Sequence, residues 1–162
     1  YQKADALSCT SATYKKRKAE GWGWDVDVIN YGGWNVTDNS SESTTEGFLC
    51  AKQQKGAKLV VAPCFVPWQM GGPYWVVKYS EPASGRGLAH AIIIGGQPNK
   101  KNHTDGTCHY RSPMQNGMWI FTRKRVLSDT EEDEVLELKT YMRDTLKLDT
   151  SKMLKTPQDA CG

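Results

Sequence analysis

The segment from Met118 to about Leu148 constrains the fold most, because it predicts a strand followed directly by an amphipathic helix. Residues 118–122 are apolar, aromatic or β-branched, which suits a strand with at least one buried face. Ser128 stands three residues before Glu131, the spacing of a capping box, and acidic side chains follow where the helix dipole favours them. We therefore expect a helix that begins after Ser128 and ends near Leu148.

This helix is expected to carry one apolar stripe on an otherwise charged surface. Its apolar residues recur at steps of three and four positions: Val135, Leu138, Met142 and Leu146. A stripe of this kind must be buried against another element. The stretches upstream resemble short strands, so the simplest architecture is an antiparallel sheet or barrel with the helix packed on its outside.

Residues 22–30 show the clearest alternation of apolar and polar side chains. The apolar side carries Trp22, Trp24, Val26 and Val28. Asp25 and Asp27 occupy the positions between them. The pattern predicts a strand whose apolar side faces the interior and whose two aspartates face water.

Further strands are expected at residues 9–15, 46–51, 57–62, 74–79 and 88–94. Residues 63–73 are expected to form an apolar loop or lid, and residues 96–117 a long polar insertion. Residues 151–154 are the candidate for a final short strand. About seven strands at this spacing, followed by one long helix, predict an all-β, up-and-down antiparallel barrel, whose closure removes free edges.

Composition narrows the class of protein without naming a function. A chain of 162 residues with 38% hydrophobic and 24% charged residues fits one globular domain, residues 1–162. No apolar run approaches the roughly 18 residues of a transmembrane helix. The net charge is only +3, and the one basic cluster, residues 15–18, is best explained as a solvated strand end. We therefore expect no nucleic-acid partner and no transmembrane segment.

The five cysteines are widely spaced and form no C-x-x-C motif. This spacing argues against a metal site, so no metal ligands are predicted. In a β-rich chain it favours disulfides and an oxidising extracytoplasmic compartment, with an odd thiol left unpaired.

Four short motifs, in their order and spacing, resemble the lipocalin family across almost the whole chain. They are Tyr1; Pro73-Tyr74-Trp75-Val76-Val77 after the strand Lys58-Leu59-Val60-Val61; Trp119-Ile120-Phe121-Thr122-Arg123; and Lys155-Thr156-Pro157-Gln158 before Cys161. The resemblance implies an eight-stranded lipocalin-type β-barrel with the C-terminal helix packed outside. Tyr1 resembles the residue after the family's Gly-x-Trp signature, so the first strand is expected to be largely missing from this chain. Arg123 matches the family arginine that packs over that tryptophan.

The resemblance also implies disulfide pairings. Cys9 and Cys161 match the pair that ties the second strand to the tail in apolipoprotein D-like members. Cys108 resembles a cysteine of retinol-binding proteins, although the usual partner position is not a cysteine here. We prefer Cys64 as the partner of Cys108, which leaves Cys50 free, and keep a Cys50 to Cys64 bond as the alternative.

The last third of the chain is similar to the lipocalin domain of violaxanthin de-epoxidase. There too a Thr-Arg strand end, as at Thr122 and Arg123, precedes a helix and a cysteine-bearing tail. This similarity implies an algal or plant chloroplast protein, in which case the oxidising compartment is the thylakoid lumen. Otherwise a secreted protein is expected.

Lipocalins hold small apolar molecules, so the resemblance implies a carrier of an isoprenoid, carotenoid, bilin or lipid, with no obligatory cofactor. Burial removes apolar ligand surface from water, at roughly 25 cal/mol per Å². Strand parity assigns the following candidate ligand-binding residues: Ala12, Tyr14, Trp24, Val26, Val28, Leu49, Leu59, Val61, Tyr74, Val76, Ala91, Ile93 and Trp119. Tyr14 and Tyr74 are the members that can hydrogen-bond a ligand.

Two other functions stay open at this point. The chain is an interaction subunit of a larger, photosynthetic complex if the insertion 96–117 docks on a partner. It is a de-epoxidase-like enzyme if ionisable groups point into the cavity. We expect no catalytic residues, because Asp25, Asp27 and His90 alternate outward, and all three histidines are expected at the surface or in loops.

Overall fold

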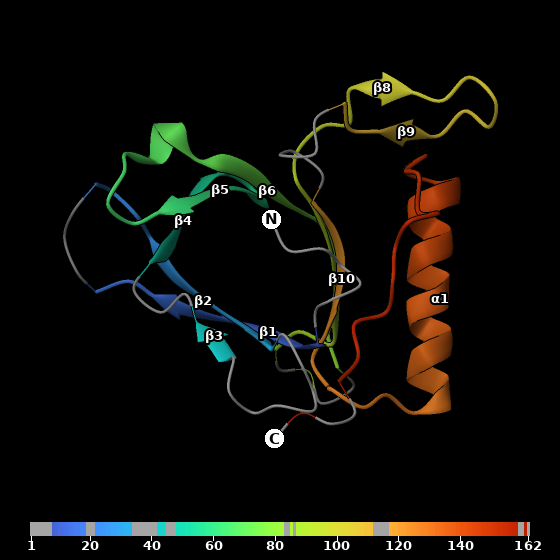
Figure 1. Cartoon of the computed structure of the whole chain (residues 1–162), viewed down its shortest axis with the longest axis horizontal. Helices are drawn as coiled ribbons and strands as arrows, with labels where there is room; N and C mark the ends of the chain where they lie inside the picture. Colours follow the sequence, from blue (N-terminus) through green and yellow to red (C-terminus); the bar gives the residue numbers. More distant parts are fainter. Residues whose placement is uncertain are drawn as a thin grey trace. The chain divides into compact units, whose positions relative to one another are not determined.

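The computed structural model shows a mostly antiparallel β protein with one C-terminal helix (Figure 1). It describes residues 8–18, 22–33, 42–44, 48–82, 85, 87–111, 117–158 and 161. The chain divides into two compact units, which are described separately: unit 1 comprises 1–73 and 154–162, and unit 2 comprises 74–153. In the described part of the chain, no helix is long and apolar enough to cross a membrane.

Unit 1 is built on an antiparallel sheet. Its strands are β1 (Ser8–Lys16), β2 (Val26–Gly33), β3 (Glu42–Thr44), β4 (Leu49–Lys55) and β5 (Lys58–Pro63). β1, β2, β4 and β5 are neighbours in that order, and β3 pairs with β2. The strands expected at 9–15 and 57–62 are confirmed within a residue or two. The strand expected at 46–51 is confirmed only from Leu49 and runs on to Lys55, while residues 46 and 47 lie outside the described residues. Gly56, at φ 57°, makes the tight turn between β4 and β5, where a residue with a Cβ would be strained.

The core of unit 1 lies on one face of this sheet. Four buried residues form its centre, and three half-buried residues from the segment after β5 pack against them: Trp24, Cys50, Val60 and Ala62, with Cys64, Val66 and Trp68. The segment after β5 contains the 3-10 helix η2 (Trp68–Met70). The apolar loop expected at 63–73 therefore covers one face of its own sheet, although Phe65 and Met70 stay exposed.

Unit 2 combines three antiparallel strands, a small hairpin and the helix. The elements are β6 (Gly72–Ser80, which begins two residues before the unit boundary), β7 (His90–Ile94), β8 (Lys100–Lys101), β9 (Cys108–His109), β10 (Met118–Thr122) and α1 (Asp129–Asp144). β7 lies between β6 and β10 and pairs with both. The strands expected at 74–79, 88–94 and 118–122 are confirmed.

Helix α1 begins where its capping box predicts. The Ser128 N–H donates to the Glu131 carboxylate at 2.9 Å, and the Lys124 ammonium lies 2.8 Å from the same side chain. These contacts, the one from Lys124 first, lower the pKa of Glu131 to about 2. The helix ends at Asp144, before the expected Leu148. Lys147 adopts a left-handed conformation with φ 55°, which turns the chain so that Leu148 is buried beside the helix instead of extending it.

The apolar stripe of α1 packs on the β6, β7 and β10 sheet. Ile92 and Ile94 of β7 contact Met142 and Leu148 to form the buried centre of unit 2. Half-buried residues surround this centre: Trp75, Val77, Met118, Ile120, Leu138, Tyr141, Leu146 and Met153. Figure 1 shows α1 running alongside this sheet. The docking predicted from the helical periodicity is confirmed.

The insertion at 96–117 is not a structureless loop in its described part, residues 96–111. β8 and β9 form a two-stranded hairpin, and Cys108 pairs with Leu148 just after α1. The Asp149 N–H donates to the Cys108 carbonyl at 3.0 Å, and the buried Tyr110 hydroxyl donates to the Gly96 carbonyl at 2.9 Å. These contacts anchor the insertion to its own unit. At 151–154, where a final strand was expected, the chain forms a turn and irregular backbone.

Candidate functional site

The candidate ligand-binding residues of unit 1 lie together, with one exception. Cross-strand registers place Tyr14 opposite Val28, Val28 opposite Leu49, and Val26 opposite Ala51, which in turn faces Val61. Because side chains at paired positions share a face, the register gathers the following on the face away from the unit 1 core: Ala12, Tyr14, Val26, Val28, Leu49, Leu59 and Val61. Tyr14 keeps 45% of its surface exposed, whereas Val28 is buried.

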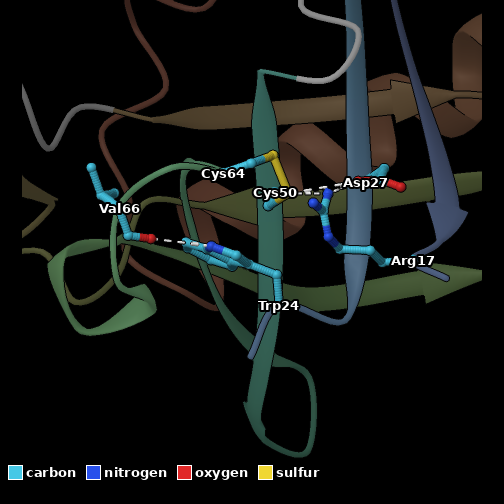
Figure 2. The surroundings of a disulfide bond; sticks show 6 residues. All are labelled: Arg17, Trp24, Asp27, Cys50, Cys64 and Val66. Carbon is cyan, nitrogen blue, oxygen red and sulfur yellow. Dashed lines mark hydrogen bonds and ion pairs between the residues drawn. A yellow bond between two sulfur atoms is a disulfide. The ribbon is translucent and has the colours of Figure 1, made fainter. Parts of the chain in front are cut away.

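Trp24 is the exception and corrects the parity argument. It packs with Cys50, Val60 and Ala62, on the opposite face of the sheet from Val26 and Val28. The Trp24 indole N–H donates to the Val66 carbonyl at 3.2 Å (Figure 2). Alternation fails here because β2 starts only at Val26, so Trp24 lies before the strand, and Trp22 and Gly23 form a turn with positive φ angles. For the same reason Trp22 is exposed and does not face an interior.

The candidate residues of unit 2 also share one face. In β7 the side chains alternate, so that Ile92 and Ile94 face α1 while Ala91 and Ile93 face away from it. Register then adds three residues from β6 and β10 to the face away from the helix: Tyr74, Val76 and Trp119. The Tyr74 and Trp119 rings stack with centroids 6.3 Å apart and planes at 26°, and Trp119 is 42% exposed.

These two groups of residues, one in each unit, are called the apolar faces below. They are rich in aromatic and β-branched side chains, which can hold an apolar molecule by contact and by removal of its surface from water. A surface hollow of about 610 Å³ lies elsewhere, along α1, and is lined by Asp133, Leu136, Glu137, Thr140, Tyr141, Asp144 and Thr145. No candidate ligand-binding residue lines this hollow.

Asp25 and Asp27 do not simply face water, as the alternation predicted. Asp25 accepts a hydrogen bond from the Lys52 ammonium at 2.9 Å and one from the Gln53 N–H. These contacts, chiefly the one from Lys52, lower the pKa of Asp25. Asp27 pairs with the Arg17 guanidinium. Both aspartates are half-buried because the sheet brings a basic side chain beside each one.

His90 corrects the expectation that all histidines are surface or loop residues. It is buried on the α1 side of β7, where Nδ1 lies 3.3 Å from the Glu134 carboxylate and 3.5 Å from the Ser80 hydroxyl. Both neighbours meet the same ring nitrogen, so the three groups do not form a relay with a base on one nitrogen and a nucleophile on the other. His90 thus contacts the helix and lies away from the apolar face of unit 2, as alternation predicted.

The disulfides differ in part from the preferred pairing. Cys9 is bonded to Cys161, with Cα atoms 5.3 Å apart, as the resemblance implied. Cys64, however, is bonded to Cys50 and not to Cys108, which is a free thiol. The reason is the β4 and β5 hairpin: Cys50 lies opposite Ala62, and the Cys64 N–H donates to the Phe48 carbonyl, so the two Cα atoms are 5.0 Å apart. Two disulfides are consistent with an oxidising compartment.

Sequence reasoning missed Arg17, which was placed in a solvated basic cluster. Lys15 and Lys16 are indeed exposed, but Arg17 turns inward, pairs with Asp27 and donates from Nη1 to the Cys50 sulfur at 3.0 Å (Figure 2). The inward position of Arg17 could have been inferred from the strand register. Once β1 pairs with β2 and β2 with β4, Arg17, Asp27 and Cys50 must occupy neighbouring positions on one face.

Arg123 holds the chain just after β10. Its backbone N–H donates to the Ala89 carbonyl at 2.9 Å, and its side-chain Nε donates to the Leu88 carbonyl at 3.2 Å. The side chain is exposed and ties the end of β10 to the segment before β7.

One group of three potential metal-ligand side chains occurs among the described residues: Asp27, Cys50 and Cys64. Its two sulfurs are joined in a disulfide and so do not offer thiolate ligands. Comparison with known proteins adds no family: no family model matches the chain, and no curated protein matches it.

Proposed function

We propose that this chain is a lipocalin-type barrel protein that carries a small apolar molecule, such as an isoprenoid, carotenoid, bilin or lipid. The observation that carries the proposal is the stacked pair of Tyr74 and Trp119 on the apolar face of unit 2. A Trp ring with 42% of its surface exposed, stacked on a second ring, offers a flat apolar surface to a ligand.

Register and chain order support the same proposal. In each unit, the strands of the main sheet pair in chain order as antiparallel neighbours when the short strands β3, β8 and β9 are left aside, which is the connectivity of an up-and-down barrel. The helix follows the last strand of the sheet and packs on the face away from Tyr74 and Trp119. The apolar face of unit 2 therefore carries the aromatic side chains that α1 does not cover.

The two other functions have less support. An interaction subunit that docks through residues 96–117 would need that segment to be available, but its described part is anchored to the chain after α1. A de-epoxidase-like enzyme would need ionisable groups on the apolar faces, but Asp27 and His90 lie on the opposite faces of their sheets.

The first test is extraction from the natural source. We expect the purified protein to carry an apolar molecule in stoichiometric amount, seen in its absorption spectrum and identified by mass spectrometry of an organic extract. A protein that is empty after native purification, and that binds no apolar probe saturably, would refute the carrier proposal.

A substitution locates the site. With the fluorescent polyene parinaric acid as probe, we expect Trp119→Ala to weaken binding by about tenfold or more, because burial of an aromatic side chain contributes about 1.5–3 kcal/mol. Leu136→Ala, which truncates an exposed residue on α1, is the matched control and should leave the dissociation constant unchanged. Equal binding by the two variants would place the ligand away from Trp119.

A further inference from the structure

We propose that the Cys50–Cys64 bond is a redox-active disulfide that exchanges with a dithiol reductant. In this proposal Cys64 is the sulfur that is attacked, Cys50 is the leaving thiolate, and Arg17 stabilises that thiolate. The proposal concerns the core face of unit 1 and is independent of the apolar faces.

The two sulfurs of this bond differ in access. Cys50 on β4 is 0% exposed, whereas Cys64 is half-buried just after β5. In thiol–disulfide exchange the nucleophile must reach one sulfur along the S–S axis, and the other sulfur departs with the electron pair. Because Cys64 is the cysteine of the pair with exposed surface, we assign it as the one that an incoming thiolate attacks, and Cys50 is then the sulfur that departs.

The sulfur that departs has a cation beside it. Arg17 Nη1 donates to Cys50 Sγ at 3.0 Å, and the Arg17 Nε is buried and has no hydrogen-bond partner among the described residues (Figure 2). A guanidinium at hydrogen-bond distance favours a thiolate over a thiol and makes the sulfur a better leaving group. The same contact is weak while Cys50 is in the disulfide, because bonded sulfur is a poor acceptor.

The reduced form of Cys50 also has a neighbour for its proton. Asp27 lies directly opposite Cys50 in the β2 and β4 register, and its Oδ1 is 3.6 Å from Cys50 Sγ. As a thiol, Cys50 can donate to Asp27; as a thiolate, it can accept from Arg17. The Arg17 and Asp27 ion pair keeps this pocket near neutral while the disulfide is intact. Arg17 and Asp27 together can therefore contact the Cys50 sulfur favourably both as a thiolate and as a thiol.

The exchange balances as a two-electron, two-proton transfer. A thiolate of the dithiol attacks Cys64 Sγ, the Cys50–Cys64 bond breaks, and the electron pair leaves on Cys50. The second thiol of the reductant then attacks the reductant's own sulfur in the mixed disulfide and releases Cys64. The reductant is oxidised to its disulfide, and both protein sulfurs end reduced with the two protons of the dithiol.

Reduction has a structural consequence within unit 1. The segment after β5 is attached to the sheet by the disulfide and by weaker contacts, which include the Cys64 N–H to Phe48 carbonyl bond at 2.7 Å and the Trp24 to Val66 bond at 3.2 Å. Loss of the covalent link leaves those hydrogen bonds to hold Val66 and Trp68 over Trp24. Tryptophan fluorescence therefore reports the reduced state.

The test titrates the oxidised full chain with dithiothreitol after the free Cys108 has been blocked. Differential alkylation and peptide mass spectrometry follow each disulfide separately, and Cys9–Cys161 is the internal reference. We expect Cys50–Cys64 to be reduced about tenfold or more faster than the reference, because a hydrogen bond from a charged donor contributes at least that factor. A Cys50–Cys64 bond that survives where Cys9–Cys161 is reduced would overturn the proposal.

Two variants separate the role of Arg17 from a general effect of charge. Arg17→Gln removes the guanidinium and should slow reduction of Cys50–Cys64 about tenfold. Lys52→Gln removes the neighbouring ion pair with Asp25 from the same face and should leave the rate within about twofold of the wild type. Equal rates in the two variants would show that Arg17 does not assist the leaving sulfur.

A trapping experiment on the wild-type protein needs no variant to fold. With 2-mercaptoethanol, which has a single thiol, we expect the mixed disulfide to form on Cys64. An adduct on Cys50 instead would refute the assigned direction of attack. The tryptophan fluorescence, to which Trp24 and Trp68 contribute, should change only as the adduct on Cys64 accumulates.

Discussion

At the scale of single residues, Tyr110 shows how one buried hydroxyl holds an insertion in place. Its O–H donates to the Gly96 carbonyl at 2.9 Å, and burial raises its pKa to about 12. The pKa of an unfolded tyrosine is about 10, so the protonated form stabilises the fold below pH 10, and this contribution is lost as the pH rises from about 10 to 12.

We therefore expect Tyr110→Phe to lower the free energy of unfolding by about 1 kcal/mol at neutral pH, because the Gly96 carbonyl loses its donor. The alkaline titration of tyrosine absorbance at 295 nm should lose one late component in this variant. Tyr79→Phe, at an exposed position on β6, is the matched control and should change neither quantity. Equal destabilisation by both variants would contradict this account of Tyr110.

At the scale of elements, α1 depends on a capping box that acid should disable. The pKa of Glu131 is about 2 in the folded chain, mainly because of the Lys124 contact and then the Ser128 backbone N–H, whereas an unperturbed glutamate has a pKa near 4.5. A lowered pKa in the folded state stabilises it above about pH 4.5, and the contribution is lost as the pH falls through 2.

We expect Glu131→Gln to lower the melting temperature at pH 7, with a difference from wild type that shrinks steadily between pH 4.5 and 2. Circular dichroism melts over this pH range measure it. Glu137→Gln, at an exposed position of the same helix, is the matched control and should leave the melting temperature at pH 7 close to that of the wild type. A Glu131→Gln deficit that is as large at pH 2 as at pH 7 would show that its charge does not carry the effect.

At the scale of the whole chain, the Cys9–Cys161 bond closes a loop of 152 residues and joins β1 to the C-terminal tail within unit 1. The Cys9 N–H donates to the Pro157 carbonyl at 2.9 Å, and the Gln158 amide donates to the Thr10 carbonyl at 2.7 Å. These two hydrogen bonds also hold the tail beside β1, in addition to the disulfide. A long closed loop removes much of the conformational freedom of the unfolded chain.

We expect the double variant Cys9→Ser, Cys161→Ser to lose about 2–5 kcal/mol of unfolding free energy in urea denaturation. Cys108→Ser, which replaces the free thiol, is the control and should cost less than about 1 kcal/mol. A loss no larger than that of the control would mean that the hydrogen bonds alone hold the tail to β1.

Local patterns were enough to predict most elements. Most strands of the main sheet, the start of α1 at its capping box, and the face of α1 that packs on the sheet follow from neighbours in sequence, because backbone propensity, capping and periodicity act over a few residues. The strand expected at 151–154 is absent, and the β8 and β9 hairpin was not predicted. Alternation also predicted which side chains share the apolar faces, with the exception of Trp24, since the strand period is two. The carrier function and the single domain 1–162 stay predictions.

Local sequence patterns thus suffice for the type and approximate position of most elements and for the side on which most strand residues lie. Four features needed the folded chain: Cys64 bonds to Cys50, Trp24 packs on the core face, Arg17 contacts a sulfur, and residues 96–111 are anchored to the chain after α1. Each of these depends on a partner many residues away, which strand register and turns bring close and which no local pattern encodes.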